Sequence, residues 1–360
     1  MIEVTTKKCI YQFNFDHAQI EVTGKCNMRC NHCRAAFEKG KNLKKEKIFK
    51  IIEFAVSHVE NINDPNSFRL IISGGEPFLH PDWYEILKYS QEKHILNVYI
   101  TTNGSLIDGT VINKLNEIKS NFNNLFVQVS VDGINSKQHD QFRHFDGAFN
   151  RCIETFKLLH KSKIKYSMRT TIIPKYLDDM EERVKLAIKN KCLRLGFGSV
   201  IWFGRASKDL ILKPNEKKRF IETIIKLKRK YKNKIEISTE DPLKFICGYE
   251  YKYKTDKKVN PDDESFFGGC TAGITGFDCS AEGNIRPCSV LDFTIVNVDD
   301  GNIEDITKRY QDSKIIKDFA SREFLGKCNA CRLKRLCGGC RAQAYAIHKD
   351  YIAEDPTCWK

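Results

Sequence analysis

Short runs of apolar and β-branched residues alternate with longer amphipathic stretches from residue 18 to about residue 240. The apolar runs have the length and composition of buried strands. We expect strands at Ala18–Thr23, Phe68–Ser73, Asn97–Thr101, Phe126–Val131, Lys165–Ile173 and Leu193–Val200. Between them, stretches such as Lys45–Val59 and Val111–Lys119 carry apolar residues at helical intervals of three and four. Six β-then-α units in succession predict an α/β fold, with a parallel sheet that is open or closed into a partial barrel.

The pattern changes after about residue 240. The polar stretch Tyr249–Asp263 predicts a loop, and short elements rich in cysteine and glycine follow it. Phe277–Cys279 and Ile285–Cys288 flank a turn sequence and predict a β-hairpin. We therefore expect two domains, residues 1–240 and residues 241–360, the second being a small α+β extension whose fold depends on bound metal.

Composition narrows the class of protein. The 360 residues, 41% of them hydrophobic, are enough for a large core. No apolar run approaches the ~18 residues that span a bilayer, and Met1–Lys8 has no signal-peptide character. We expect a cytoplasmic protein with no membrane partner. Inside the cell, fifteen cysteines are explained better by metal binding or catalysis than by disulfides.

The formal net charge of +14 raises the question of nucleic-acid binding. Much of the excess lies in helical stretches such as Lys217–Lys232, which are typical of a solvated helix face. A nucleic-acid binder would also interleave aromatic and basic residues on one face, and the sequence has no such patch. We expect no nucleic-acid partner. A moderate positive field favours an acidic peptide or a substrate that bears carboxylates.

Three cysteines follow the first predicted strand with the spacing C-x3-C-x2-C: Cys26, Cys30 and Cys33. The carboxyl ends of parallel strands gather at one edge of the sheet, where chemistry is usually placed. Three thiolates so close together can hold three irons of a [4Fe–4S] cluster, which four cysteines normally ligate. The fourth iron would be open to a ligand that is not protein, which indicates chemistry rather than a structural clip.

A glycine-rich run, Ser73–Pro77, follows the second predicted strand. Its glycines let the backbone approach a ligand closely, and Glu76 can accept hydrogen bonds from an ammonium group. Alone, the run fits an ordinary strand-to-helix turn equally well. Together, the cysteine triplet and this run resemble the signature of the radical S-adenosylmethionine (SAM) superfamily, and the resemblance continues in order along the barrel.

The resemblance implies a partial (β/α)6 barrel of the TIM type, in which the open iron binds the amino and carboxylate groups of SAM. Gly74, Gly75 and Glu76 would orient the amino group. Reductive cleavage would give methionine and a 5′-deoxyadenosyl radical, which abstracts a substrate hydrogen. The other cofactor contacts that the resemblance implies are His32 near the adenine, Ser130 and Asp132 at the ribose and methionine, and more weakly Arg143 and Thr170.

Eight further cysteines in the tail have spacings similar to the SPASM extension, which carries two auxiliary [4Fe–4S] clusters in peptide-modifying radical SAM enzymes. The resemblance assigns to the first auxiliary cluster Cys270, Cys279, Cys288 and Cys340. It assigns to the second auxiliary cluster Cys328, Cys331, Cys337 and Cys358. Many members have three residues rather than two between the positions of Cys337 and Cys340, which leaves the partners of these two open. Zinc is the alternative for the Cys-x2-Cys pairs, although zinc pairs usually lie further apart.

Two positions bear on the type of reaction. Sulfatase-maturating members place a catalytic Asp directly after the third cysteine of the tail, where this chain has Ser289, although Asp292 is close by. Cys247 precedes the tail and is a candidate catalytic hydrogen donor to a substrate radical, a role that a cysteine has in some radical SAM epimerases. The alternative for Cys247 is a buried free thiol, and Cys9, Cys152 and Cys192 are interpreted in that way.

The leading hypothesis from the sequence is a maturase that abstracts a hydrogen from a ribosomally made peptide and installs a crosslink or an epimerised residue. Its partners would be a peptide with a leader and a reductant such as flavodoxin or ferredoxin. Because the first cysteine of the triplet comes at residue 26, either a separate recognition protein or direct substrate binding by the barrel would be required. The alternative rests on Cys33–Ala35, Gly338–Tyr345 and Ala353–Pro356, which resemble radical SAM enzymes of haem biosynthesis that act on propionate side chains. A third hypothesis is a metal-stabilised binding protein without enzymatic activity.

Overall fold

The computed structural model describes residues 1–34, 40–247 and 268–360, so the loop expected over Tyr249–Asp263 lies outside the described residues. A ten-stranded sheet forms the centre of the molecule, with the strand order β12-β11-β10-β3-β4-β5-β6-β7-β8-β9. The strands are β1 (Ile2–Thr5), β2 (Ile10–Phe13), β3 (His17–Thr23), β4 (Arg69–Gly74), β5 (Asn97–Thr102), β6 (Asn124–Ser130), β7 (Lys165–Ile172), β8 (Arg194–Ser199), β9 (Glu236–Thr239), β10 (Gly276–Cys279), β11 (Asn284–Arg286) and β12 (Val296–Asn297).

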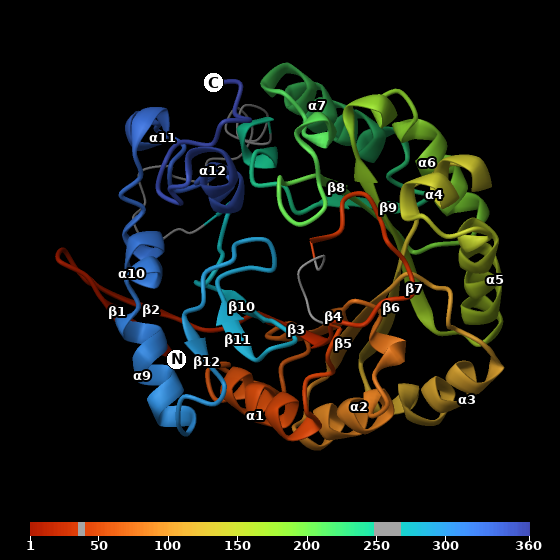
Figure 1. The fold of residues 1–360 in the computed structure, drawn as a ribbon, viewed down its shortest axis with the longest axis horizontal. Helices are drawn as coiled ribbons and strands as arrows, with labels where there is room; N and C mark the ends of the chain where they lie inside the picture. Colours follow the sequence, from red (N-terminus) through yellow and green to blue (C-terminus); the bar gives the residue numbers. More distant parts are fainter. Residues whose placement is uncertain (35–39, 248–267) are drawn as a thin grey trace.

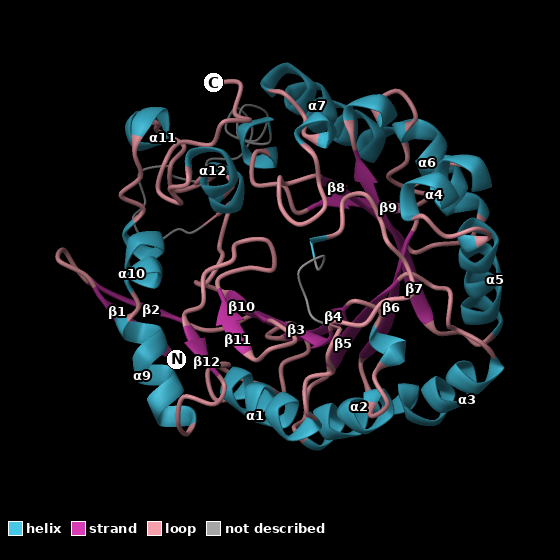
Figure 2. Ribbon diagram, viewed as in Figure 1, coloured by secondary structure: helices cyan, strands magenta, loops and turns pink. Residues whose placement is uncertain are grey.

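Helices cover the outer face of this curved sheet, as Figures 1 and 2 show. The α-helices are α1 (Lys45–Val56), α2 (Trp83–Glu92), α3 (Gly109–Ile118), α4 (Ser136–Arg143), α5 (Ala148–Lys161), α6 (Met180–Lys189), α7 (Pro214–Lys230), α9 (Ile303–Asp312), α10 (Lys314–Ser321), α11 (Gly326–Ala330) and α12 (Arg341–His348). Short 3-10 helices lie at η2 (Pro77–Leu79), η3 (Lys119–Asn121), η4 (Pro174–Tyr176) and η5 (Lys208–Leu210). None of these helices combines the length and apolar composition that crossing a membrane requires.

The predicted α/β fold is confirmed. Strands β3 to β8 correspond to the six expected strands, and every neighbouring pair from β3 to β9 is parallel. The sequence pattern missed β9, which is only four residues long. It also missed the antiparallel hairpin of β1 and β2, which lies against α9 and α10. The helix expected over Lys45–Val59 ends at Val56.

The expected hairpin of the tail is confirmed as well, but it does not form a separate sheet. β10 pairs antiparallel with β11 and also pairs in parallel with β3, the first strand of the barrel. The tail therefore extends the barrel sheet across the boundary expected near residue 240. In Figure 1 these blue strands continue directly from the red strand β3.

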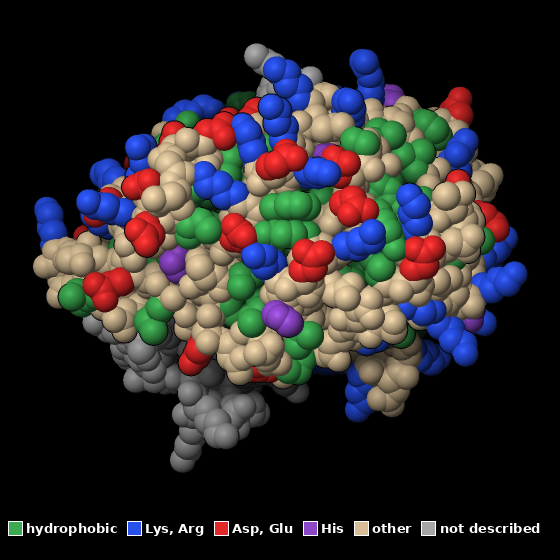
Figure 3. All heavy atoms as spheres, turned by 90° about the horizontal axis from the view of Figure 1, so that it is seen from below, with side chains coloured by type: hydrophobic (Ala, Val, Ile, Leu, Met, Phe, Trp, Pro, Cys, Tyr) green, Lys and Arg blue, Asp and Glu red, His purple; other side chains and the backbone are tan. Residues whose placement is uncertain are grey.

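Along the strands, successive side chains point to opposite faces of the sheet. On β3, Ala18, Ile20 and Val22 are buried in the core beneath the outer helices. The intervening residue Glu21 therefore points to the inner face of the barrel, where it is 1% exposed. The outer surface is mixed in charge. Figure 3 shows basic and acidic side chains interspersed on the face seen from below Figure 1, with no continuous basic stripe on that face.

Candidate functional site

The cysteine triplet lies in the loop that follows β3. Cys26 is exposed, Cys33 is half-buried and Cys30 is buried. Arg205 ties this loop to the segment after β8, because its amide donates to the carbonyl of Cys33 at 3.0 Å and its Nε donates to the carbonyl of Cys30 at 3.2 Å. The three thiols therefore belong to one loop that is held at the carboxyl edge of the sheet, as the sequence predicts.

The glycine-rich run at the end of β4 supports the start of this loop. A Cβ atom on Gly75 would lie 2.1 Å from the carbonyl oxygen of Lys25 and 3.1 Å from the Cβ atom of Cys26. The φ angle of Gly74 is +131°, and a Cβ there would lie 2.3 Å from the carbonyl oxygen of Thr23. Side chains at these positions would displace the loop, so the two glycines allow the cysteine loop to lie directly on β4.

The carboxylate of Glu76 is hydrogen-bonded within the protein. Its Oε1 accepts a hydrogen bond from Thr102 Oγ1 at 2.7 Å, and its Oε2 accepts one from the amide of Asn103 at 2.8 Å. Glu76 is fully buried, and this burial raises its pKa to about 7. Its side chain therefore joins the ends of β4 and β5, while its amide donates to the carbonyl of Lys25 at 2.8 Å.

A buried ion pair lies behind the triplet. Asp132 Oδ2 accepts hydrogen bonds from Arg143 Nε at 3.0 Å and Nη2 at 2.6 Å, and Asp132 Oδ1 accepts one from the amide of Thr171 at 2.8 Å. Burial alone would raise the pKa of Asp132, but the Arg143 guanidinium holds it well below its usual range. His32 Nε2 lies 3.8 Å from Asp132, and the His32 ring stacks on Phe142 with 4.8 Å between ring centroids.

The other two predicted cofactor contacts lie on different faces of the sheet. On β6, Val127 and Val129 are buried in the core, so Ser130 lies on the inner face. On β7, Thr170 shares the outer face with Met168 and Ile172, and all three are fully buried. The structure therefore places the Ser130 side chain on the inner face and the Thr170 side chain on the outer face.

Arg169 is an inner-face residue that the sequence reasoning missed. It pairs with Ser130 across β6 and β7, and its guanidinium lies beside Gly198 of β8, where an added Cβ would be 2.9 Å from Arg169 Nη2. Burial lowers the pKa of His32 to about 4, and the positive charges of Arg143, Arg169 and Arg205 contribute to that shift. The sequence signal that could have identified Arg169 is its charge in the middle of a strand whose neighbouring positions are buried.

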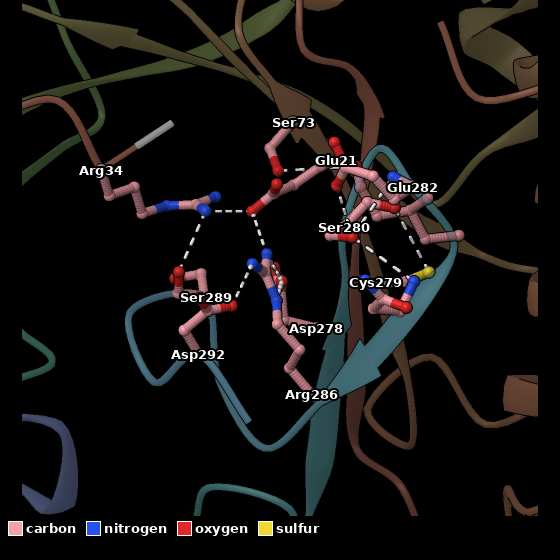
Figure 4. Close-up of polar contacts among 12 residues, drawn as sticks. Glu21, Arg34, Ser73, Asp278, Cys279, Ser280, Glu282, Arg286, Ser289 and Asp292 are labelled. Atoms are coloured by element: carbon pink, nitrogen blue, oxygen red, sulfur yellow. Dashed lines mark hydrogen bonds and ion pairs between the residues drawn. The ribbon is translucent and has the colours of Figure 1, made fainter. Parts of the chain in front are cut away.

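A second group of charges lies on the inner face between β3 and the tail. We call Glu21, Arg34, Asp278 and Arg286 the inner-face charge cluster. Figure 4 shows that Arg34 and Arg286 both reach Glu21; Arg286 Nη2 lies 2.7 Å from it. Arg286 Nε also lies 3.1 Å from Asp278. Arg34, which directly follows Cys33, donates to the carbonyl of Ser289 at 3.0 Å, so this cluster joins the triplet loop to the loop after Cys288.

The four cysteines expected for the second auxiliary cluster surround one cavity of about 70 Å³. Its lining includes Cys328, Cys331, Cys337 and Cys358, together with Leu243, Ile246 and Asp355. Burial raises the pKa of the Cys337 thiol, and the neighbouring Asp355, Cys358 and Cys328 raise it further. Four thiols that line one cavity are a donor set that fits an iron–sulfur cluster.

Three of the four cysteines expected for the first auxiliary cluster also lie together. Burial raises the pKa of the Cys340 thiol, and Cys270 and Cys288 are close enough to add to that shift. Burial likewise raises the pKa of the Cys288 thiol to about 12, and the nearby Cys270 adds to that shift. The Cys279 thiol donates to the carbonyl of Ser280 at 3.6 Å.

The triplet suits a cluster rather than a single ion. Within residues 1–34, 40–247 and 268–360, no three Cys, His, Asp or Glu side chains are arranged to hold one metal ion. A [4Fe–4S] cluster needs another arrangement, because each thiolate binds a different iron. Three thiols on one loop, beside a backbone that only glycine permits, fit that requirement.

Comparison with known proteins agrees with this geometry. The sequence model of the radical SAM superfamily matches residues 20–187, which run from β3 to α6 and include the triplet and the glycine-rich run. The chain belongs to the radical SAM superfamily.

This radical SAM enzyme is similar to proteins with different substrates. It is 29% identical over 343 residues to the AdoMet-dependent heme synthase of Methanosarcina barkeri, and the match covers 94% of each chain. It is 25% identical to the subtilosin biosynthesis protein AlbA of Bacillus subtilis, with 95% of this chain and 70% of that protein covered. The structure of Streptococcus suis SuiB bound to the precursor peptide SuiA superposes with a TM-score of 0.75 at 20% identity, covering 96% of this chain and 76% of SuiB.

The structure includes both positions that bear on the type of reaction, Asp292 and Cys247. Asp292, near the position of the sulfatase-maturase Asp, is 63% exposed at its side chain and lies 3.8 Å from Arg286. Cys247 is half-buried and packs against the main core of this radical SAM enzyme. Neither position decides the substrate.

Proposed function

We propose that this radical SAM enzyme abstracts a hydrogen atom from a carboxylate-bearing side chain of a tetrapyrrole. The observation that carries this proposal is the match to the heme synthase of Methanosarcina barkeri, which extends over 94% of both chains. Because the match covers nearly all of both chains, almost every part of this protein has a counterpart in the synthase. The tail motifs around Cys340 and Cys358 that suggest haem biosynthesis from the sequence point in the same direction.

In this proposal the triplet of Cys26, Cys30 and Cys33 holds a [4Fe–4S] cluster at the carboxyl edge of the sheet. SAM, when bound to that cluster and reduced, supplies the 5′-deoxyadenosyl radical. Gly74 and Gly75 keep the loop of the triplet against β4. The backbone of Gly74 and Gly75 would be available to the SAM amino group, whereas the Glu76 carboxylate is hydrogen-bonded to Thr102 and Asn103.

The inner face supplies the charges that a carboxylate substrate requires. Arg143, Arg169 and Arg205 are close enough to His32 to lower its pKa, so several cations face this part of the barrel. Arg143 is committed to Asp132 through two hydrogen bonds. Arg169 and Arg205 are then the candidates to bind a substrate carboxylate, because a guanidinium forms paired hydrogen bonds with that group.

The tail forms the second part of the proposal. Residues 241–360 would hold two auxiliary clusters, so the loaded protein would carry three iron–sulfur clusters. The cavity lined by Cys328, Cys331, Cys337 and Cys358 supports the second of these. Two buried arginines accompany the tail cysteines. Arg341 Nη2 lies 3.9 Å from Cys328 Sγ, and Arg322 donates to the carbonyl of Cys270 at 3.0 Å.

The test is an anaerobic reaction of the reconstituted enzyme with SAM, a strong reductant and Fe-coproporphyrin III. We expect 5′-deoxyadenosine to accumulate together with porphyrin products in which propionate groups have become vinyl groups. A hydrogen atom would pass to the 5′-deoxyadenosyl radical, carbon dioxide would leave, and the remaining electron would return to the iron–sulfur centres, so that SAM is the net oxidant. Arg169→Gln should weaken porphyrin binding while SAM cleavage without substrate continues. Cleavage of SAM with no change in the porphyrin, at any concentration, would refute the tetrapyrrole substrate and leave the radical SAM chemistry intact.

A peptide substrate is the second candidate. It is favoured by the likeness to SuiB, whose structure contains a precursor peptide, and by the similarity to AlbA. A peptide with a leader, a separate recognition protein and a flavodoxin or ferredoxin reductant would then be the partners. Cys247 would be a candidate donor of the final hydrogen atom in an epimerisation. Cys247→Ala should abolish epimerised product but not SAM cleavage in that case, and unchanged epimerisation would exclude the role.

A further inference from the structure

The pairing of the tail hairpin separates Cys279 from Cys288. Cys279 pairs with Ile285 and Asp278 pairs with Arg286, so Cys288 lies two residues beyond the last pair, at the opposite end of the hairpin. The amide of Gly273 donates to the carbonyls of both Gly276 and Pro287, which fixes that end. Three strand positions at ~3.3 Å each separate the two cysteines by about 10 Å along the strand.

The two cysteines also lie on different faces of the sheet. Cys279 shares a face with Phe277, whose ring lies 5.3 Å from that of Phe54 on helix α1 and 5.1 Å from that of Phe15. That face is the outer, helix-covered one. Asp278 points the other way, into the inner-face charge cluster, as does its pairing partner Arg286, and Cys288 lies two residues beyond Arg286 and so has the same orientation. Cys288 is therefore on the inner side.

The environment of Cys279 is that of a core residue. Its side chain is fully buried and belongs to the main apolar cluster, next to the β3 partner Ile20. In Figure 4 its sulfur points away from Asp278 and Arg286, toward the turn that contains Ser280 and Glu282. A cluster at this place would have to displace packed apolar side chains between the sheet and α1.

The remaining three cysteines of the set come from separate segments that meet on the other side. Cys270 precedes β10, Cys288 follows β11, and Cys340 caps the start of α12. The backbone supports their meeting, because the amide of Cys270 donates to the carbonyl of Cys337 at 3.0 Å. Arg322 then donates to the carbonyls of Cys270 and Gly268, which holds this segment in place.

We propose that the first auxiliary cluster is held by three thiolates, those of Cys270, Cys288 and Cys340, and that Cys279 is a packing residue. This inference rests on the proposed function to the extent that the tail binds clusters at all. It corrects the four-cysteine set that the sequence resemblance implies. The fourth iron of this cluster is then ligated by a group other than Cys279.

The test compares iron and acid-labile sulfide in single variants after anaerobic reconstitution. Cys279→Ala should retain the wild-type content of about twelve irons and the wild-type electron paramagnetic resonance spectrum of the reduced protein. Cys288→Ala should lose about four irons. Cys192→Ala is the matched control, because Cys192 is also a buried cysteine of the core. Cys279→Val, which refills the volume, distinguishes a lost ligand from a lost packing contact.

The iron contents of the variants and of the wild type distinguish a failure of this inference from a failure of the proposed function. If both Cys279→Ala and Cys279→Val lose about four irons while Cys192→Ala does not, Cys279 is a ligand and the inference is overturned. If the wild-type protein itself binds only about four irons, the auxiliary clusters are absent, and both the inference and that part of the proposed function fail. Retention of iron in both Cys279 variants, with loss in Cys288→Ala, supports the three-thiolate set.

Discussion

Gly75→Ala tests how the glycine-rich run supports the cysteine triplet. The added Cβ would lie 2.1 Å from the carbonyl oxygen of Lys25, whereas ordinary contact begins near 3.4 Å, so the loop must retreat by about 1.3 Å. Such overpacking costs roughly 1–3 kcal/mol. Because the obstacle is the backbone next to Cys26, the strain falls on the geometry of the triplet, and a cost of that size weakens cluster binding by about one to two orders of magnitude.

The assay measures iron retained by the triplet during titration with a chelator, in parallel with urea unfolding of the iron-free protein. Gly109→Ala is the control, because a Cβ on Gly109 meets nothing within 4 Å. It should leave iron retention unchanged and should stabilise the protein slightly, by about 0.4–1 kcal/mol. If Gly75→Ala folds, retains iron and cleaves SAM like the wild type, the proposed role of the glycine is wrong.

Three further predictions concern buried groups. Asp132→Asn leaves the Arg143 guanidinium buried without its counter-charge and should cost about 3–5 kcal/mol in urea unfolding, whereas Glu154→Gln in an exposed pair should cost little. Burial raises the pKa of the Cys30 thiol to about 11. The protonated thiol should therefore contribute to the stability of the iron-free protein below the unfolded pKa of about 8.5, and this contribution should be lost as the pH rises toward 11. Equal free energies of unfolding at about pH 8 and pH 10 would contradict this. Arg341→Lys removes the contact to Cys328 and should cost about 1.5–3 kcal/mol and shift the midpoint potential of the tail clusters, while the exposed Arg309→Lys should not.

Local pattern was sufficient for much of the fold. Each of the six expected strands agrees with β3 to β8 to within two residues, because each is a short run rich in apolar and β-branched residues with a helix after it. The triplet could be placed at the carboxyl edge for the same reason, since it directly follows β3. The grouping of Cys328, Cys331, Cys337 and Cys358 came from the resemblance to the SPASM extension, and these four cysteines line one cavity.

Other features depend on contacts between distant segments. The parallel pairing of β10 with β3 joins residues more than 250 positions apart, and nothing in the local pattern encodes it. The same pairing decides which face of the sheet Cys279 occupies, whereas its assignment to the first auxiliary cluster came from the resemblance. The face that Thr170 occupies likewise depends on the register of β7 in the sheet, because a shift of one residue moves a side chain to the other face.

The central claim is that Cys26, Cys30 and Cys33 hold a cluster that cleaves SAM. The most direct measurement is the release of 5′-deoxyadenosine from SAM by the reduced, reconstituted protein, compared with Cys30→Ala. The account predicts release by the wild type and none by the variant, while Cys152→Ala, a change at a buried core cysteine, releases it normally. Release by Cys30→Ala at the wild-type rate, or none by an iron-loaded wild type, would contradict the account.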